Sequence, residues 1–182
     1  MPESTDRRVR RTRKLLQDGL LALMRRKPLE DITVKELAET ADVARATVYV
    51  HFKDPADVLA QLEQSIYADV DAILARHAPA ELAQSPAALL GELFAYVREN
   101  RPSFEVLLGD HGDRAFAADL RALCAERASA ALRLKIPGAD DAAIAYRAVF
   151  LVGGYETLLQ RWMLGGCQEP PEELARLAGQ IA

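Results

Sequence analysis

The sequence predicts an all-α protein, with a three-helix N-terminal unit joined to a C-terminal helical bundle and about nine helices in total. Ala, Leu, Arg and Glu dominate the 182 residues, and these residue types favour helices. Apolar residues recur every three or four positions, whereas alternating apolar and polar runs are few and no Asn-Gly hairpin turn occurs. Half of the residues are apolar, which is enough for a sizeable core.

Positive charge is concentrated at the N-terminal end. Residues 1–55 contain 12 Lys and Arg against nine Asp and Glu, a net charge of +3. Residues 56–182 contain 11 against 18, a net charge of −7. Six of the eight residues in Arg7–Lys14 are basic. Such a run is either a solvated surface or an arm along DNA phosphates or in the minor groove. The motif that follows it favours the arm.

Three short elements follow the basic run. An amphipathic stripe that includes Leu16 and Leu20 predicts the first helix, which Pro28 ends. Thr33 and Glu36 have the T-x-x-E spacing of a capping box, which predicts the start of a second helix. Ala41 and Asp42 then fit a tight turn.

A third helix is expected from about Ala44 to His51. Val48 and Phe52 have the i, i+4 spacing of a buried face. The remaining faces carry hydrogen-bonding side chains, namely Arg45, Thr47, Tyr49 and His51. This is the layout of a helix-turn-helix, whose second helix enters the DNA major groove.

The stretch ITVKELAETADVARATVYVHFKDPADVL also resembles the N-terminal signature of TetR/AcrR-type transcriptional regulators. Its most specific part is T-x-Y-x-x-F, formed by Thr47, Tyr49 and Phe52 and followed by Lys53-Asp54. Asp42 stands where the family usually has Gly, and Asp tolerates the left-handed backbone of such a turn. The resemblance implies a dimeric DNA-binding transcriptional regulator. We expect residues 7–53 to bind DNA and residues 54–182 to bind a ligand and dimerise.

The candidate DNA contacts are Arg10, Arg11, Thr33, Lys35, Arg45, Ala46, Thr47, Tyr49, His51 and Lys53. The Arg45 fork can bond both acceptors of guanine, and the Thr47 methyl can meet the methyl of thymine. The resemblance to the family implies that Lys35 also reaches a base. Tyr49 and Lys53 match family residues that hold phosphates.

The bundle is predicted from apolar stripes over about 55–77, 87–100, 104–108, 113–135, 140–164 and 172–181, with a loop at 78–85. The helix over 140–164 is apolar nearly all round, so it is expected to be buried on more than one side. Gly153-Gly154 in its middle suits the close approach of another backbone. In the family, the last two long helices pair in the dimer. The candidate interface residues are Val152, Gly153, Gly154, Leu158, Trp162, Leu174 and Leu177.

A small apolar or aromatic effector is expected in the bundle, although residues of these types at such positions are more often simple core. The candidates are Phe94, Val97, Phe104, Leu108, Phe116, Tyr146, Phe150 and Tyr155. The two tyrosines need hydrogen-bond partners if buried.

Other functions have weaker signals. Asp110-His111-Gly112-Asp113 is the only compact polar cluster that could support an enzyme, and a capped loop also explains it. An interaction module that acts with a partner protein is a further alternative. Cys124 and Cys167 lack metal spacing and suit reduced thiols in a cytoplasm. No apolar run reaches the length of a membrane span. We therefore expect no enzyme activity, cofactor, metal or membrane partner, but a double-stranded DNA operator, a homodimer and a cytoplasmic location.

Overall fold

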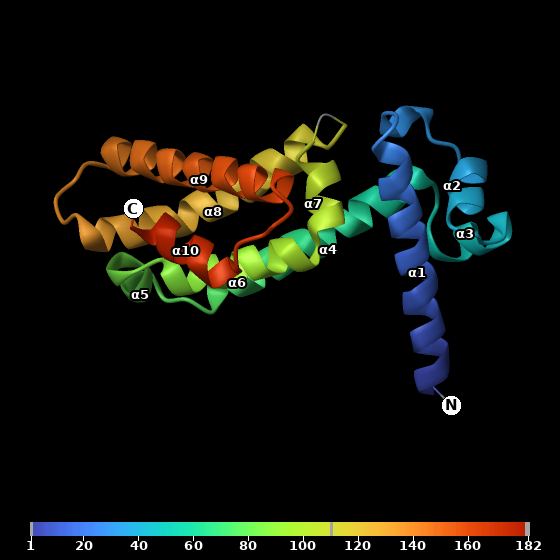
Figure 1. Ribbon diagram of the computed structural model, residues 1–182, viewed down its shortest axis with the longest axis horizontal. Coiled ribbons are helices and arrows are strands. Elements are labelled where there is room, and N and C mark those ends of the chain that lie inside the picture. The colour runs from blue at the N-terminus through green and yellow to red at the C-terminus, as the bar shows by residue number, and fades with distance from the viewer. Residues whose placement is uncertain (1, 110, 181–182) are drawn as a thin grey trace. The chain divides into compact units, whose positions relative to one another are not determined.

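The computed structural model describes residues 2–109 and 111–180, with side chains from Arg7 onward. Those residues form ten α-helices and one short 3-10 helix, with no strand, so the all-α prediction is confirmed (Figure 1). The additional helix is α5 (Pro79–Gln84), in the stretch expected to be a loop. The Glu81 carboxylate accepts a hydrogen bond from the Ala78 N–H at 3.2 Å and caps its first turn. Pro79 takes the first helical position, where proline is favoured.

The helices form two compact units. The first comprises the chain up to Ile66 together with Val106–Asp113, and the second comprises Tyr67–Glu105 together with the chain from Arg114. Both α4 (Pro55–Ala75) and α7 (Arg101–Leu107) contribute to the two units. The packing boundary therefore lies further along the chain than the functional boundary expected at residues 53 and 54.

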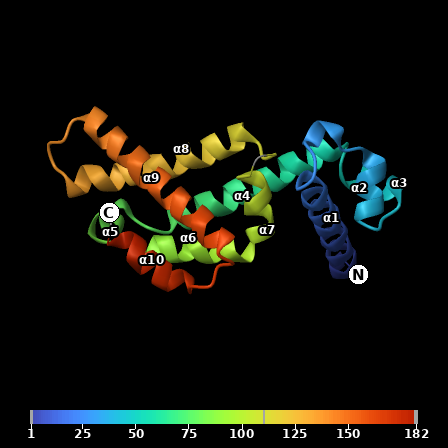
Figure 2. The same cartoon turned by 45° about the horizontal axis from the view of Figure 1, so that its top comes forward.

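The first unit is built on α1 (Pro2–Met24), the 3-10 helix η1 (Leu29–Asp31), α2 (Val34–Thr40), α3 (Arg45–His51) and the start of α4. α1 packs against α2, and α2 against α3 (Figure 2). The side chains that are completely buried in this unit include Leu16, Leu20, Leu37, Val48 and Val58. Burying a Leu or Val side chain contributes about 1.5–3 kcal/mol, so these few residues supply much of the stability of this unit.

The basic run lies inside α1. This helix begins at Pro2, so Arg7–Lys14 is part of the first helix rather than a segment ahead of it, and its contact with DNA stays a prediction. Proline is tolerated in a first helical turn, and no other helix-breaking residue precedes Gly19. Arg10 and Arg11 are exposed on this helix. The positive charges of Arg10 and Arg11 therefore lie on the surface of a helix.

A carboxyl group on α4 is shielded within the first unit. One carboxylate oxygen of Glu63 is inaccessible to solvent and has no hydrogen-bond partner among the described residues. Burial and the negative charge of Asp113 raise the pKa of Glu63 to about 7. The loop that carries Asp113 is tightly folded, because a Cβ on Gly112 would lie 2.0 Å from the carbonyl oxygen of Leu107. Only glycine fits there.

The second unit consists of paired helices. α6 (Ala87–Glu99) packs against α10 (Pro171–Gly179), and α8 (Arg114–Lys135) packs against α9 (Asp141–Leu164) and α5. α8 and α9 run antiparallel (Figure 1). One buried cluster joins α6, α9 and α10 through Leu90, Phe94, Trp162, Leu174, Ala175 and Ala178. A second cluster of Leu132, Ile144 and Ala148 joins α8 to α9.

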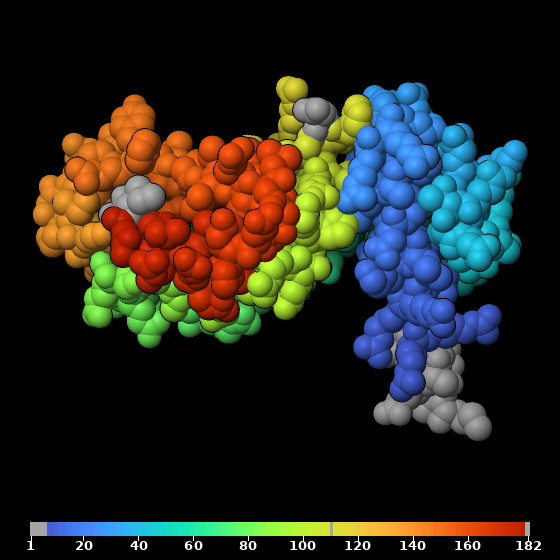
Figure 3. Space-filling view, viewed as in Figure 1, coloured from blue at the N-terminus to red at the C-terminus, as the bar shows by residue number. Residues whose placement is uncertain are grey.

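The outer surface of α9 carries an apolar stripe. Figure 3 shows this helix in orange beside the red α10. Tyr146, Val149 and Phe150 have exposed fractions of 78, 65 and 76%. Gly153 and Gly154 continue the stripe, and a Cβ added to either would meet no atom within 4 Å. The helix expected to be buried on more than one side is therefore exposed on one side of this chain.

α9 is also long and apolar enough to cross a membrane, judged by length and composition alone. Of its most apolar stretch, 11% is buried. The expectation that no segment reaches this length needs correction. It considered unbroken apolar runs, whereas one long stretch of α9 is apolar enough on average although the helix also carries charged residues.

Candidate nucleic-acid interface

The turn between α2 and α3 is tight. Asp42 has a φ of 52°, in the left-handed region that Asp tolerates better than most residues. The Val43 N–H donates to the Ala38 carbonyl oxygen at 3.0 Å. Gly19 of α1 lies against this turn, since a Cβ at Gly19 would be 3.2 Å from the Cβ of Ala41. A glycine in α1 thus allows the turn to approach the helix closely.

α3 has a buried side and an exposed side. Val48 and, just after the helix, Phe52 are 0 and 2% exposed, so their predicted inward orientation is confirmed. The exposed side consists of Arg45, Ala46, Tyr49 and Val50, and the partly buried Thr47 and His51 flank it. The sequence reasoning missed Val50, which is 76% exposed. Its position four residues after Ala46 could have placed it on this face.

Arg45 and Tyr49 contact each other on the exposed side. Arg45 Nη2 donates to Tyr49 Oη at 3.3 Å, and the guanidinium carbon lies 5.8 Å from the ring centroid. A cation–π contact at an exposed site contributes about 0.5–1 kcal/mol. Arg45 is the first residue of α3, at the end that reaches base edges when a helix-turn-helix docks, and the contact with Tyr49 restricts its side chain there.

The backbone at Lys53 is held by a chain of hydrogen bonds. The Lys53 N–H donates to Asp57 Oδ2 at 2.8 Å, and the Gln61 amide donates to Asp57 Oδ1 at 2.9 Å. The bond from Gln61 is the larger cause, and the bond from the Lys53 backbone the second, of a lowered pKa at Asp57. Arg13 donates to Gln61, and its guanidinium carbon lies 5.0 Å from the Phe52 ring centroid. Arg13 therefore serves packing, while the Lys53 side chain stays exposed.

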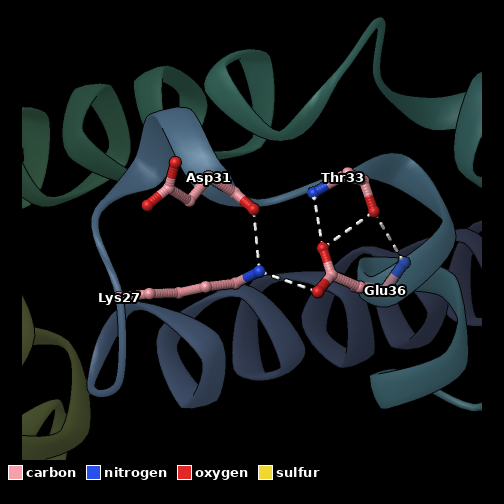
Figure 4. Close-up of polar contacts among 4 residues, drawn as sticks. All are labelled: Lys27, Asp31, Thr33 and Glu36. Carbon is pink, nitrogen blue, oxygen red and sulfur yellow. Dashed lines mark hydrogen bonds and ion pairs between the residues drawn. The ribbon is translucent and has the colours of Figure 1, made fainter.

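The predicted capping box is present at the start of α2, and Lys27 extends it (Figure 4). The Glu36 N–H donates to Thr33 Oγ1 at 3.2 Å. Glu36 Oε2 accepts from the Thr33 N–H at 3.0 Å and from the Thr33 hydroxyl at 2.8 Å. Lys27 Nζ donates to Glu36 Oε1 and to the Asp31 carbonyl oxygen, both at 2.7 Å. The bond from Lys27, followed by the two bonds from Thr33, lowers the pKa of Glu36 to about 2.

All ten candidate DNA contacts belong to the first unit. Lys35 is exposed on α2, where its ammonium lies 3.9 Å from the Glu39 carboxylate. Thr33 is exposed as well, but its amide and hydroxyl both donate to Glu36. Both donors of Thr33 are thus engaged within the protein. Contacts of all ten residues with DNA stay predictions.

The candidate ligand residues are dispersed. Phe94 and Tyr155 lie at the cluster that joins α6, α9 and α10. Val97, Phe104 and Phe116 are buried elsewhere in the second unit, and Leu108 belongs to the first unit. Tyr146 and Phe150 are a correction, because both lie on the exposed stripe of α9 rather than inside the bundle.

Tyr155 has an unusual hydroxyl group. This hydroxyl is shielded from solvent and has no hydrogen-bond partner within the described residues. Burial raises the pKa of Tyr155. By contrast, the Tyr96 hydroxyl donates to Asp69 at 2.8 Å. A shielded hydroxyl without a partner is costly, so Tyr155 stands out among the candidates.

The candidate dimer residues also divide. Trp162 and Leu174 are buried in the core of their own chain, which is a correction to their assignment as interface residues. The reason is that one cluster joins α6, α9 and α10, so that Trp162 of α9 and Leu174 of α10 both pack within the chain. Leu158 is partly buried against the same cluster. Val152, Gly153, Gly154 and Leu177 retain accessible surface.

The polar cluster expected at 110–113 lies in the loop between α7 and α8. Asp110 lies outside the described residues. Among the side chains that the structure describes, those of residues 7–109 and 111–180, no group of three from His, Cys, Asp or Glu could hold a metal ion. Both cysteines are free, and burial raises the pKa of Cys124 to about 11, which makes a reactive thiolate scarce.

A helix-turn-helix with an exposed second helix, joined to a separate helical bundle, defines a class of transcriptional regulator. The chain belongs to the TetR family of these regulators. The family model described as "Bacterial regulatory proteins, tetR family" matches residues 16–62. The one described as "Transcriptional regulator C-terminal region" matches residues 84–182. A search among curated proteins finds no match.

Solved structures share the fold. A complex of SmeT with triclosan has a TM-score of 0.69 at 19% identity, covering 93% of this chain and 88% of that one. The fatty acid degradation regulator FadR from Bacillus halodurans has a TM-score of 0.66 at 15% identity, covering 93% of both chains. FadR from Bacillus subtilis in complex with stearoyl-CoA has a TM-score of 0.61 at 14% identity, covering 92% and 96%.

Proposed function

We propose that this TetR-family regulator binds a palindromic DNA operator as a homodimer and acts as a cytoplasmic repressor. The observation that carries the proposal is the exposed side of α3, where Arg45 and Tyr49 are presented above the buried Val48 and Phe52. The packing of a helical bundle does not require hydrogen-bonding and aromatic side chains on the exposed side of a helix. In the proposed mode α3 of each protomer enters the major groove.

The exposed residues have different roles in this mode. Arg45, near the start of α3, bonds guanine, and the Thr47 methyl contacts thymine. Lys35 reaches a base from α2. Tyr49, His51 and Lys53 lie further along and hold phosphates, which position the protein without reading sequence. Ala46 and Thr33, both exposed, are further proposed contacts, and Arg10 and Arg11 add charge from α1.

The test begins with selection of bound sequences from random DNA by the purified protein, read for two-fold symmetry. Arg45→Ala should then relax the preference at one symmetric pair of positions, by about 1–3 kcal/mol per bidentate contact. Lys53→Ala should weaken binding to every sequence alike. Arg98→Ala, at an exposed cation of the second unit, is the control. Uniform weakening by Arg45→Ala together with changed base preference in Lys53→Ala would refute the assignment.

We propose that a second copy of the chain covers the apolar stripe of α9. Tyr146, Val149 and Phe150 supply large apolar side chains, and Gly153 and Gly154 leave room for an approaching backbone. Two-fold pairing of one face with itself is the commonest closed arrangement. A membrane could also cover such a helix, and its charged residues argue against that alternative. Light scattering at micromolar concentration in detergent-free buffer distinguishes the two.

The effector is proposed to be a small apolar or aromatic molecule that binds beside Tyr155. The supporting observations are the shielded Tyr155 hydroxyl and its apolar neighbours Phe94 and Trp162. An effector that bonds this hydroxyl would offset the cost of its burial. Triclosan and stearoyl-CoA, which bind the similar regulators, are suitable probes. Thermal stabilisation and release of the selected operator would support this site. The absence of both effects with every apolar probe would count against it.

A further inference from the structure

Lys27 occupies a junction between three elements of the first unit, and no function described above involves it. It follows α1, and its ammonium donates to η1 at the Asp31 carbonyl and to α2 at Glu36. Figure 4 shows that the two bonds leave the ammonium in different directions. One side chain thus ties the end of α1 to the connection and to the helix that follow it.

The partner of Lys27 is itself held in one orientation. Glu36 accepts from the Thr33 amide and hydroxyl through Oε2, so its Oε1 is aimed at Lys27. The side chains of Lys27 and Glu36 are 27% and 39% exposed, so water screens the ion pair only in part. An oriented, partly shielded pair resists displacement better than a mobile surface pair.

α2 is the helix on which the position of α3 depends. α2 packs against both α1 and α3. α3 has only seven residues, and Val48 is its buried contact. A small rotation of α2 on α1 would therefore carry the exposed residues of α3 with it.

We propose that Lys27 is a positioning residue for DNA binding, which acts through Glu36 to fix α2 and α3 on α1 and does not contact DNA itself. This inference rests on the proposed function. Arg26, the adjacent cation, is exposed and provides a matched control.

The test compares Lys27→Met, Lys27→Arg, Glu36→Gln and the double variant Lys27→Met/Glu36→Gln on the selected operator over a range of salt concentrations. Lys27→Met should weaken binding about tenfold, because each of two half-sites becomes about threefold weaker. Its salt slope should equal that of the wild type, and Lys27→Arg should restore most of the affinity. In the Glu36→Gln background, Lys27→Met should cost less than it does in the wild type, because only the bond to the Asp31 carbonyl remains to be lost. Arg26→Met should leave the geometry, and hence base preference, unchanged.

Folding is checked separately by circular dichroism and by the amide NMR signals of Thr33 and Glu36, which report the capping box. If Lys27→Met does not fold, Glu36→Gln alone carries the test and should give the same loss. A salt slope reduced by about 0.9 per phosphate, with the full loss retained in the Glu36→Gln background, would make Lys27 a phosphate ligand and overturn the proposal. Unchanged affinity in Lys27→Met or Glu36→Gln would also overturn it. Failure of the wild type to bind any DNA would instead refute the proposed function.

Discussion

Replacing Glu63 by Gln should stabilise the protein at pH 8 and leave its stability at pH 5 nearly unchanged. The folded chain raises the pKa of Glu63 from 4.5 to about 7, through burial first and the charge of Asp113 second. Between pH 4.5 and about pH 7, the folded state binds more protons at Glu63 than the unfolded state does. The free energy of unfolding must therefore fall as pH rises through this window.

The size of the effect follows from the shift. One pKa unit corresponds to about 1.36 kcal/mol, so the full shift would correspond to about 3 kcal/mol. Because Glu63 is only partly buried, screening reduces the expected gain to about 1–2 kcal/mol. For a chain of this length that gain raises the midpoint of thermal unfolding by about 2–8 °C.

The assay is thermal unfolding of wild type and Glu63→Gln, followed by circular dichroism at pH 5, 6, 7 and 8. Glu30→Gln is the control, because Glu30 is an exposed carboxylate of the same unit. The two curves of midpoint against pH should converge at pH 5 and separate towards pH 8. A gain of equal size at both ends of the range, or a loss at pH 8, would refute the reasoning from the shielded oxygen.

Four further outcomes are expected. Phe52→Ala should lower the free energy of unfolding by about 3–5 kcal/mol in urea titrations, whereas a cost below about 1 kcal/mol would deny its burial. Gly154→Leu should weaken the dimer by about 1–3 kcal/mol through overpacking while the monomer keeps its fold; light scattering that shows no change would argue against the α9 interface. Tyr155→Phe should not destabilise the ligand-free protein but should reduce its thermal shift with triclosan. Replacing Arg10 and Arg11 by Gln should make the salt dependence of DNA binding shallower by about 0.9 for each phosphate that these arginines neutralise, and an unchanged slope would show that they neutralise no phosphate.

Local chemistry made the helix-turn-helix predictable. The capping box depends on Thr33 and Glu36 alone, and the turn depends on the tolerance of Asp42 for a positive φ. The inward orientation of Val48 and Phe52 follows from helical spacing. Each of these features is decided within a few residues, so the sequence contains what is needed to infer it.

The features that the sequence did not reveal depend on distant contacts. Leu174 looked available for a partner, but α10 buries it against α6 of the same chain. Tyr146 looked like core because α9 is apolar nearly all round, and only the packing of α9 on α8 shows which side remains exposed. The role of Lys27 depends on where η1 places the Asp31 carbonyl. Periodicity cannot decide between alternative burial partners for the same apolar residue.

The contact between Arg45 and Tyr49 makes base recognition an exchange of partners. In the free protein the guanidinium donates to the Tyr49 hydroxyl, so a guanine must displace that bond or share the same nitrogen. The loss of affinity measured for Arg45→Ala is then a difference between two contacts, and it understates the strength of the guanine contact itself. Tyr49→Phe would remove the competing acceptor, while its ring would still limit the rotamers that Arg45 can sample. The Arg45 side chain has therefore lost part of its conformational entropy before it binds DNA, so that binding costs less entropy.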